Sequence, residues 1–187
     1  MVNTREKLLT TALGVFAERG TDGGSMREVA RRAGVNVATA YHHFGSKRDL
    51  LLTIFREMFV DVADYDGAWG PAPDDPREAL QALLHLSWAY LSSGADVLRL
   101  AIAEGLKGDQ EILAVFDEWQ QRGDRAIENQ LLRGGLATPQ NVGRRALTVR
   151  HVIWGAFTSA LIGGPLDGEH FRVLADHAAH ELFESWT

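Results

Sequence analysis

Apolar residues recur along almost the whole chain at intervals of three and four, which is the spacing of one face of an α-helix. In the first such segment Leu8, Ala12, Val15 and Phe16 share a face, and Gly20 ends the pattern. No run alternates between apolar and polar residues as a half-buried strand would. The pattern therefore predicts an all-α protein with about nine helices.

Helix-start signals divide the first 60 residues further. Ser25 with Glu28, and Ser46 with Asp49, have the spacing of a capping box, in which two side chains satisfy backbone N–H groups at a helix start. Asn36 suits the N-cap of a helix over about residues 37–44. Two short helices joined by the sequence AGVN are typical of a helix-turn-helix, with Gly34 in the tight turn and Val35 as a buried plug.

The composition changes after this head. Residues 64–76, DYDGAWGPAPDDP, contain three Pro and two Gly, which indicates a connector. Asp75 and Pro76 suit the N-cap and first position of the next helix. Thr138 and Pro139 suit the start of a long helix that reaches about residue 162. We therefore expect two domains, residues 1–60 and residues 61–187, the second being a helical bundle.

The charge is unevenly distributed over the 187 residues. The net charge is −6, but residues 1–60 hold nine Lys and Arg against six Asp and Glu, whereas residues 61–187 hold ten against nineteen. Only the head is therefore suited to a polyanion such as nucleic acid. The chain has no Cys, which excludes disulfides and thiolate metal sites and fits a reducing compartment.

No segment approaches the roughly 20 uncharged apolar residues of a membrane span. The N-terminus carries charged residues and no long apolar run, which argues against a signal peptide. We therefore expect a cytoplasmic protein without membrane association.

The segment VATAYHHF, residues 37–44, carries the densest group of polar donors. His42 and His43 point about 100° apart on a helix, so they are poorly placed to share a metal ion. His170, His177 and Glu181 recur near helical spacing in the last helix, where a solvated face explains them better than a metal site does. The sequence contains no legible catalytic triad and no Gly-rich phosphate loop after a strand. We expect no enzymatic activity, no metal and no cofactor.

Donors on this segment could instead reach the phosphates of DNA. Thr39, Tyr41, His42 and His43 lie within about one and a half turns of the second helix of the motif, which enters the major groove in a helix-turn-helix. Lys47 lies in the first turn of the next helix, where a cation and free backbone N–H groups together favour an anion. Phe44 is expected to anchor the helix in the core.

The sequence GSMREVARRAGVNVATAYHHFGSKRDLLLTIF, residues 24–55, resembles the TetR family of transcriptional regulators. The resemblance carries over the Ala-Gly-Val turn, the pattern Thr-x-Tyr-x-His-Phe and the following Lys, and covers about residues 5–55. It implies that Arg27 contacts a base edge or a phosphate, and that His42 likewise contacts a base or a phosphate. Because Val37 and Ala38, which would face the bases, offer no hydrogen bonds, DNA shape would contribute to recognition. The residues that would hold phosphates are Thr39, Tyr41, His43 and Lys47.

The acidic body is expected to dimerise the protein and to hold a ligand. Two recognition helices about one turn of DNA apart require a two-fold dimer, and the last two long helices mix small and large residues as helix interfaces do. The predicted interface residues are Ala156, Ala160, Leu161, Leu174, Ala178 and Leu182. The resemblance also implies an apolar ligand pocket, for which the candidates are His85, Trp88, Ile102, Phe116, Trp119, His151 and Trp154.

The resulting hypothesis is a ligand-responsive transcriptional repressor that binds a palindromic DNA operator as a homodimer and is released by a small-molecule effector. Repression is implied by the resemblance alone. The alternative is a helical adaptor whose head docks a protein partner, which the small positive balance of the head keeps open.

Overall fold

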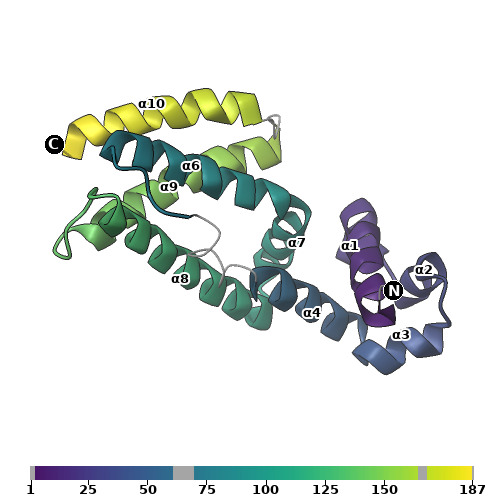
Figure 1. Ribbon diagram of the computed structural model, residues 1–187. Coiled ribbons are helices and arrows are strands. Elements are labelled where there is room, and N and C mark those ends of the chain that lie inside the picture. Colours follow the sequence, from purple (N-terminus) through teal and green to yellow (C-terminus); the bar gives the residue numbers. More distant parts are fainter. Residues whose placement is uncertain (1–2, 61–69, 164–167, 187) are drawn as a thin grey trace. The chain divides into compact units, whose positions relative to one another are not determined.

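The computed structural model describes residues 3–60, 70–163 and 168–186. Within these ranges every regular element is an α-helix, which confirms the predicted all-α class (Figure 1). The predicted connector is described only from Gly70 onward, where residues 70–75 are not helical. The helices are α1 (Thr4–Gly23), α2 (Met26–Ala33), α3 (Val37–Phe44), α4 (Lys47–Val60), α6 (Pro76–Ser93), α7 (Ala95–Leu106), α8 (Gln110–Arg133), α9 (Val142–Ile162) and α10 (Gly168–Trp186).

These helices form two compact units. The first consists of Met1–Val60 with Asp96–Glu118, and the second of Asp61–Ala95 with Trp119–Thr187. This grouping differs from a single division at residue 60, because α7 and the start of α8 belong with the head. Ion pairs join these segments to residues 1–60. Asp109 and Glu111 pair with Arg48, and Lys107 pairs with Asp22.

The start and end of α1 follow from local signals. Asn3 and Glu6 form a reciprocal capping box at its start, and Gly20 has a φ of +69° that interrupts the helix before a last turn ending at Gly23. Gly24 then lies directly against Phe16. A Cβ on Gly24 would be 2.4 Å from a carbon of the fully buried Phe16 ring. The sequence therefore predicted the interruption at Gly20 correctly, but it missed the last helical turn, which ends at Gly23.

The turn between α2 and α3 has the predicted form, with one exception. Ser25 accepts a hydrogen bond from the Glu28 N–H, Gly34 has a left-handed φ of +67°, and Asn36 accepts from Ala38. Val35 is half-buried rather than buried. The Glu28 side chain does not complete the predicted capping box, because its carboxylate binds Arg31 and Arg32 at 2.8–2.9 Å instead.

The predicted starts of α4 and α6 agree with the structure, and the predicted start of α9 does not. Ser46 caps α4 through the Asp49 N–H, and Asp75 caps α6 with Pro76 at the first position. The start of α9 was predicted too early. Thr138 and Asn141 close a turn by backbone and side-chain hydrogen bonds of 2.8–3.0 Å, and α9 begins only at Val142. A Thr-Pro pair therefore opened a turn here, and not the helix itself.

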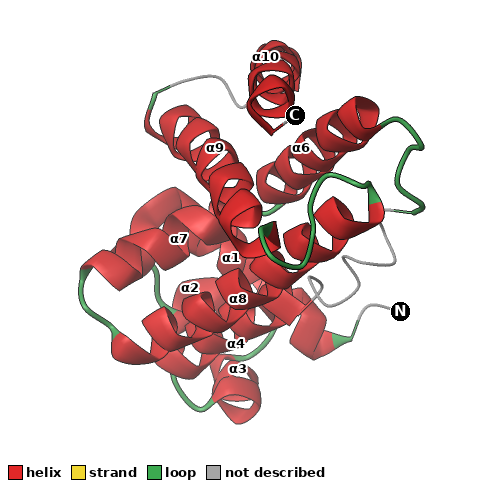
Figure 2. Ribbon diagram, turned by 90° about the vertical axis from the view of Figure 1, so that its left-hand side faces the viewer, coloured by secondary structure: helices red, strands yellow, loops and turns green. Residues whose placement is uncertain are grey.

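Aromatic packing dominates the core of the second unit. The ring of Trp88 stacks on Phe171, with centroids 4.1 Å apart and planes within 6°, and meets Phe157 edge-on at 6.1 Å. These rings join α6, α9 and α10 and are at most 6% exposed. Figure 2 shows the described residues as helices and loops, with α10 beside α6. Over the described residues, no helix is long and apolar enough to cross a lipid bilayer.

Candidate nucleic-acid interface and small-molecule pocket

The α3 helix separates a buried face from an exposed one. Ala40 and Phe44 are 0% and 4% exposed and pack into the head, while Ala38, Tyr41, His42 and His43 are exposed. Tyr41 is 48% exposed, although a tyrosine ring normally gains by burial. A short helix with a rigid apolar underside and an outer face of phenol and imidazole groups can lie in a DNA groove and donate to phosphates.

The other predicted contacts lie on α3 and α2 and differ in exposure. Val37 and Thr39 are half-buried. Arg27, in the first turn of α2, is exposed, and its side chain makes no hydrogen bond or ion pair among the described residues. Its guanidinium is therefore available for a base edge or a phosphate.

Lys47 has a structural partner that sequence reasoning did not identify. Its ammonium donates to the carbonyl oxygens of Thr21 and Gly24, at the end of α1. An ammonium has three hydrogens, so one remains for a phosphate. Lys47 therefore joins the start of α4 to the end of α1, and replacing it would disturb the head as well as any DNA contact.

Several other cations of the head are already paired. Arg31 and Arg32 bind Glu28, and these hydrogen bonds, that of Arg31 first, lower the pKa of Glu28 to about 2. Arg48 and Arg56 both bind Glu111, and Arg48 also binds Asp109. The positive balance of the head therefore overstates the charge that is free for DNA. This makes Arg27 and the donors of α3 the main candidates.

The Arg48–Asp109 pair predicts that the stability of the folded protein depends on pH. The hydrogen bond from Arg48 lowers the pKa of Asp109 from its ordinary 3.8 to about 2. Because the folded pKa lies below the unfolded one, this stabilisation is present above about pH 4 and is lost as the pH falls towards 2. Asp109→Asn should therefore lower the urea midpoint of unfolding near neutral pH, and its difference from the unmodified protein should shrink below about pH 4.

The effect should be modest, because the pair is partly exposed. Asp74→Asn, at an exposed aspartate without an ion pair among the described residues, is the control. It should have the urea midpoint of the unmodified protein at neutral pH and at low pH. A difference between Asp109→Asn and the unmodified protein that stays constant down to about pH 2 would contradict the assignment.

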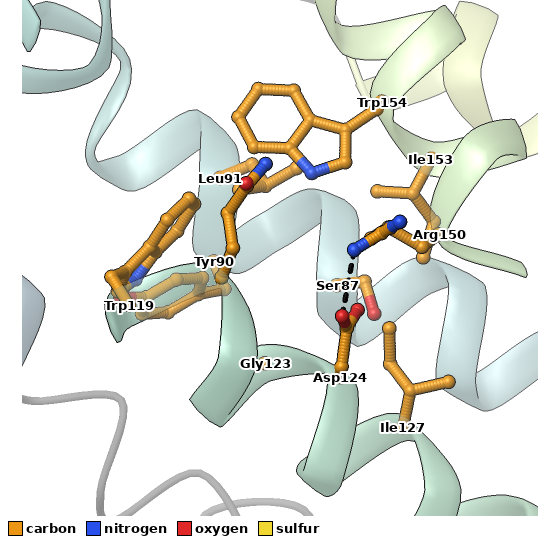
Figure 3. A pocket seen from close by; sticks show the side chains of 11 residues that line it. Ser87, Tyr90, Leu91, Trp119, Gly123, Asp124, Ile127, Arg150, Ile153 and Trp154 are labelled. Atoms are coloured by element: carbon orange, nitrogen blue, oxygen red, sulfur yellow. Dashed lines mark hydrogen bonds and ion pairs between the residues drawn. The ribbon is translucent and has the colours of Figure 1, made fainter. Parts of the chain in front are cut away.

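A cavity of about 50 Å³ lies within the second unit, between α6, α8 and α9 (Figure 3). Arg150 binds Asp124 across it at 2.7 Å, and Trp119 donates to the Tyr90 hydroxyl at 3.1 Å. Trp119 and Trp154 meet edge to face, with centroids 5.8 Å apart. The lining consists of Ser87, Tyr90, Leu91, Trp119, Gln120, Gly123, Asp124, Ile127, Arg150, Ile153 and Trp154.

Of the seven predicted pocket residues, Trp119 and Trp154 line this cavity and five do not. Trp88 is core, Ile102 and Phe116 belong to the first unit, and the exposed His151 lies against the Leu147 carbonyl of its own helix at 2.7 Å. His85 does not line the cavity, and its Nε2 lies 3.3 Å from Oδ1 of Asp176. The prediction chose aromatic and imidazole side chains by type, whereas rotation of each helix decides which of them face the cavity. Sequence reasoning missed the Asp124–Arg150 pair for the same reason.

The predicted dimer residues lie on α9 and α10. Leu174 is 39% exposed, and the other five are half-buried. A second hollow, of about 90 Å³, lies beside Ala156, Ala160 and Leu174. Small residues and partly exposed leucines on two long helices suit a helix–helix interface, which stays a prediction.

Comparison with known proteins identifies relatives of the head. The sequence profile of the family described as bacterial regulatory proteins, tetR family, matches residues 8–54. The HTH-type transcriptional regulator BetI of Rhizobium meliloti is 39% identical over 84 residues, 45% of this chain and 41% of that protein. The HTH-type transcriptional repressor AcnR of Corynebacterium efficiens is 30% identical over 132 residues, 71% of this chain and 66% of that protein. The chain thus spans less than half the length of BetI.

Solved structures share the fold over nearly the whole chain. A structure from Mesorhizobium loti, described as a TetR-family transcriptional regulator, has a TM-score of 0.81 at 21% identity and covers 97% of this chain and 96% of its own. A transcriptional regulator from Saccharomonospora viridis, solved in complex with choline, has a TM-score of 0.77 at 24% identity, with coverages of 96% and 95%. At these identities the likeness establishes the fold.

Proposed function

Because the chain belongs to the TetR family of bacterial regulatory proteins, we propose that it is a DNA-binding transcriptional regulator controlled by a small molecule. The observation that carries this proposal is α3, which is anchored by Phe44 and exposes Tyr41, His42 and His43. Arg27 of α2 is also exposed, and its side chain has no partner among the described residues. Phosphate contacts from this face would position the head, and α3 would enter the major groove.

The finer proposal is a homodimer that represses transcription from a palindromic operator. A two-fold dimer through α9 and α10 would place two copies of α3 about one helical turn of DNA apart, roughly 34 Å. The name of the relative AcnR, a repressor, supports the sign of regulation. The cavity in the second unit supports a small-molecule effector, as does the choline bound to the Saccharomonospora viridis regulator.

Selection of duplexes from a random DNA library by the purified protein, at low and moderate salt, tests the proposal. The expected result is a palindromic consensus whose affinity falls steeply with salt, because phosphate contacts release counterions. Tyr41→Ala should weaken binding to all sequences by about tenfold and lower the slope of log affinity against log salt. Asp74→Asn, at an exposed position outside residues 1–60 and outside α9 and α10, is the control and should bind as the unmodified protein does.

Lys47→Ala is a poorer test, because its bonds to the Thr21 and Gly24 carbonyls make it destabilising as well. Failure to enrich any duplex at low salt, before and after refolding to remove a bound ligand, would contradict the proposal. That outcome would favour a head that docks a protein partner.

A further inference from the structure

The cavity in the second unit has aromatic walls. The ring planes of Trp119 and Trp154 make an angle of 87°. The ring plane of Tyr90 makes an angle of 26° with that of Trp119, and the two ring centroids are 6.4 Å apart. Two ring planes at a right angle form a corner, and a group in that corner faces both rings. Figure 3 shows Trp119 and Trp154 bordering the space whose other side carries Asp124 and Arg150. Aromatic faces are electron-rich and attract cations.

Asp124 on α8 carries an acceptor that the protein leaves unsatisfied. Its Oδ2 accepts from Arg150 at 2.7 Å, whereas its Oδ1 is buried and has no hydrogen-bond partner among the described residues. No donor reaches this oxygen, so a cation in the cavity would act on the negative charge of the carboxylate through space and not through a hydrogen bond to Oδ1. The carboxylate therefore has interaction capacity that Arg150 does not use.

The size of the cavity limits the ligand. It measures about 50 Å³, and a single water requires roughly 10–15 Å³ by a comparable measure. Only a compact group of a few non-hydrogen atoms fits, which excludes a long acyl chain enclosed in the cavity as it stands.

We propose that the corner formed by Trp119 and Trp154, opposite Asp124, binds a compact organic ammonium cation. The inference rests on the proposed function for its regulatory meaning, since it names the effector class of that same cavity. The other charged group of the lining, Arg150, opposes a cation, but its charge is compensated by Asp124 at 2.7 Å. The Asp124–Arg150 pair is close to neutral as a whole, so the faces of the aromatic rings decide the sign of the ligand's charge, and they favour a cation.

Binding would also act on the link between two helices. Asp124 lies on α8 and Arg150 on α9, so an ammonium that approaches Asp124 competes for the carboxylate that joins them. The same helix α8 begins beside Asp109, whose side chain holds Arg48 of the head. A ligand with different affinities for two arrangements of α8 would shift the population between them.

Quenching of tryptophan fluorescence on titration with choline tests the inference on the full-length protein. The comparison ligand is its neutral tert-butyl analogue, in which carbon replaces the nitrogen. Choline should bind about tenfold or more tightly than this analogue, because only the charged ligand gains from the ring faces and the carboxylate. Equal affinities, or tighter binding of the carboxylate tert-butylacetate, would overturn the inference.

Four variants separate the contributions. Trp154→Leu and Asp124→Asn should each weaken choline binding about tenfold and hardly change binding of the neutral analogue. Trp186→Phe, outside the cavity, should leave choline binding unchanged. Arg150→Gln decides the sign of the ligand's charge, because removing this cation should preserve or raise affinity for an ammonium. A loss of choline affinity of about tenfold or more with Arg150→Gln would overturn the inference, and a loss of tert-butylacetate affinity with the same variant would identify Arg150 as the anchor of an anion.

The two proposals fail in distinguishable ways. Fluorescence titration requires no DNA, and selection of an operator requires no ligand. A protein that selects a palindrome but does not distinguish choline from its neutral analogue retains the proposed function and loses this inference. A protein that binds choline as described but enriches no duplex loses the proposed function, while the site remains supported.

Discussion

Replacing Phe44 with Ala should lower the free energy of unfolding of the head by about 3–5 kcal/mol and abolish specific DNA binding. Its ring is 4% exposed at the last position of α3, with the Arg5 guanidinium 5.6 Å from its centroid. Truncation would leave a cavity under a helix of only eight residues, which is too short to be stable without packing. The face that carries Tyr41 and His43 would then lose its fixed orientation.

Urea unfolding of Phe44→Ala, followed by circular dichroism, measures the loss of stability, and a DNA-binding titration measures the loss of function. All five Trp lie in the residue ranges of the second unit, so fluorescence reports on that unit separately. Tyr41→Ala is the matched control, because this neighbour is 48% exposed and should lose DNA affinity with little change in stability. Native stability in Phe44→Ala would contradict the anchoring role.

Replacing Trp88 with Ala should destabilise the second unit by about 3–5 kcal/mol. The indole is 6% exposed, stacks on Phe171 at 4.1 Å and contacts Phe157 edge-on. Removing it leaves a large hole between α6, α9 and α10, and the two phenylalanines lose their shared partner. Trp88→Phe should recover part of the loss, because a smaller ring can still stack on Phe171.

The free energy of unfolding, from urea titrations followed by circular dichroism and the remaining Trp fluorescence, tests this expectation. Trp186→Ala is the matched control. Its half-buried ring lies 4.7 Å from the Arg145 guanidinium near the end of α10, and its loss should cost less than about 1 kcal/mol. Equal losses in Trp88→Ala and Trp186→Ala would mean that the stacked rings are not the centre of this core.

Sequence reasoning was accurate for several features that depend on residues close together in the chain. Asn36 and Asp75 cap the helices they were expected to cap, and Gly34 has the left-handed φ that the turn between α2 and α3 requires. It failed where a side chain has a choice of partners. The Glu28 carboxylate binds Arg31 and Arg32, and the Lys47 ammonium binds the Thr21 and Gly24 carbonyls. The partners of Lys47 lie 26 and 23 residues away in the chain and are brought near by folding, whereas the partners of Glu28 lie on its own helix and compete with the capping position.

The sequence by itself determined the helical class and the helix-turn-helix, because caps, a left-handed glycine and apolar periodicity act over a few residues. Only the tertiary structure decided which residues surround the cavity. Tyr90, Asp124 and Arg150 come from three helices, and their convergence depends on how far each helix is rotated about its axis. That rotation is set by packing of side chains such as Trp88, Phe157 and Phe171 against one another, which no local pattern specifies.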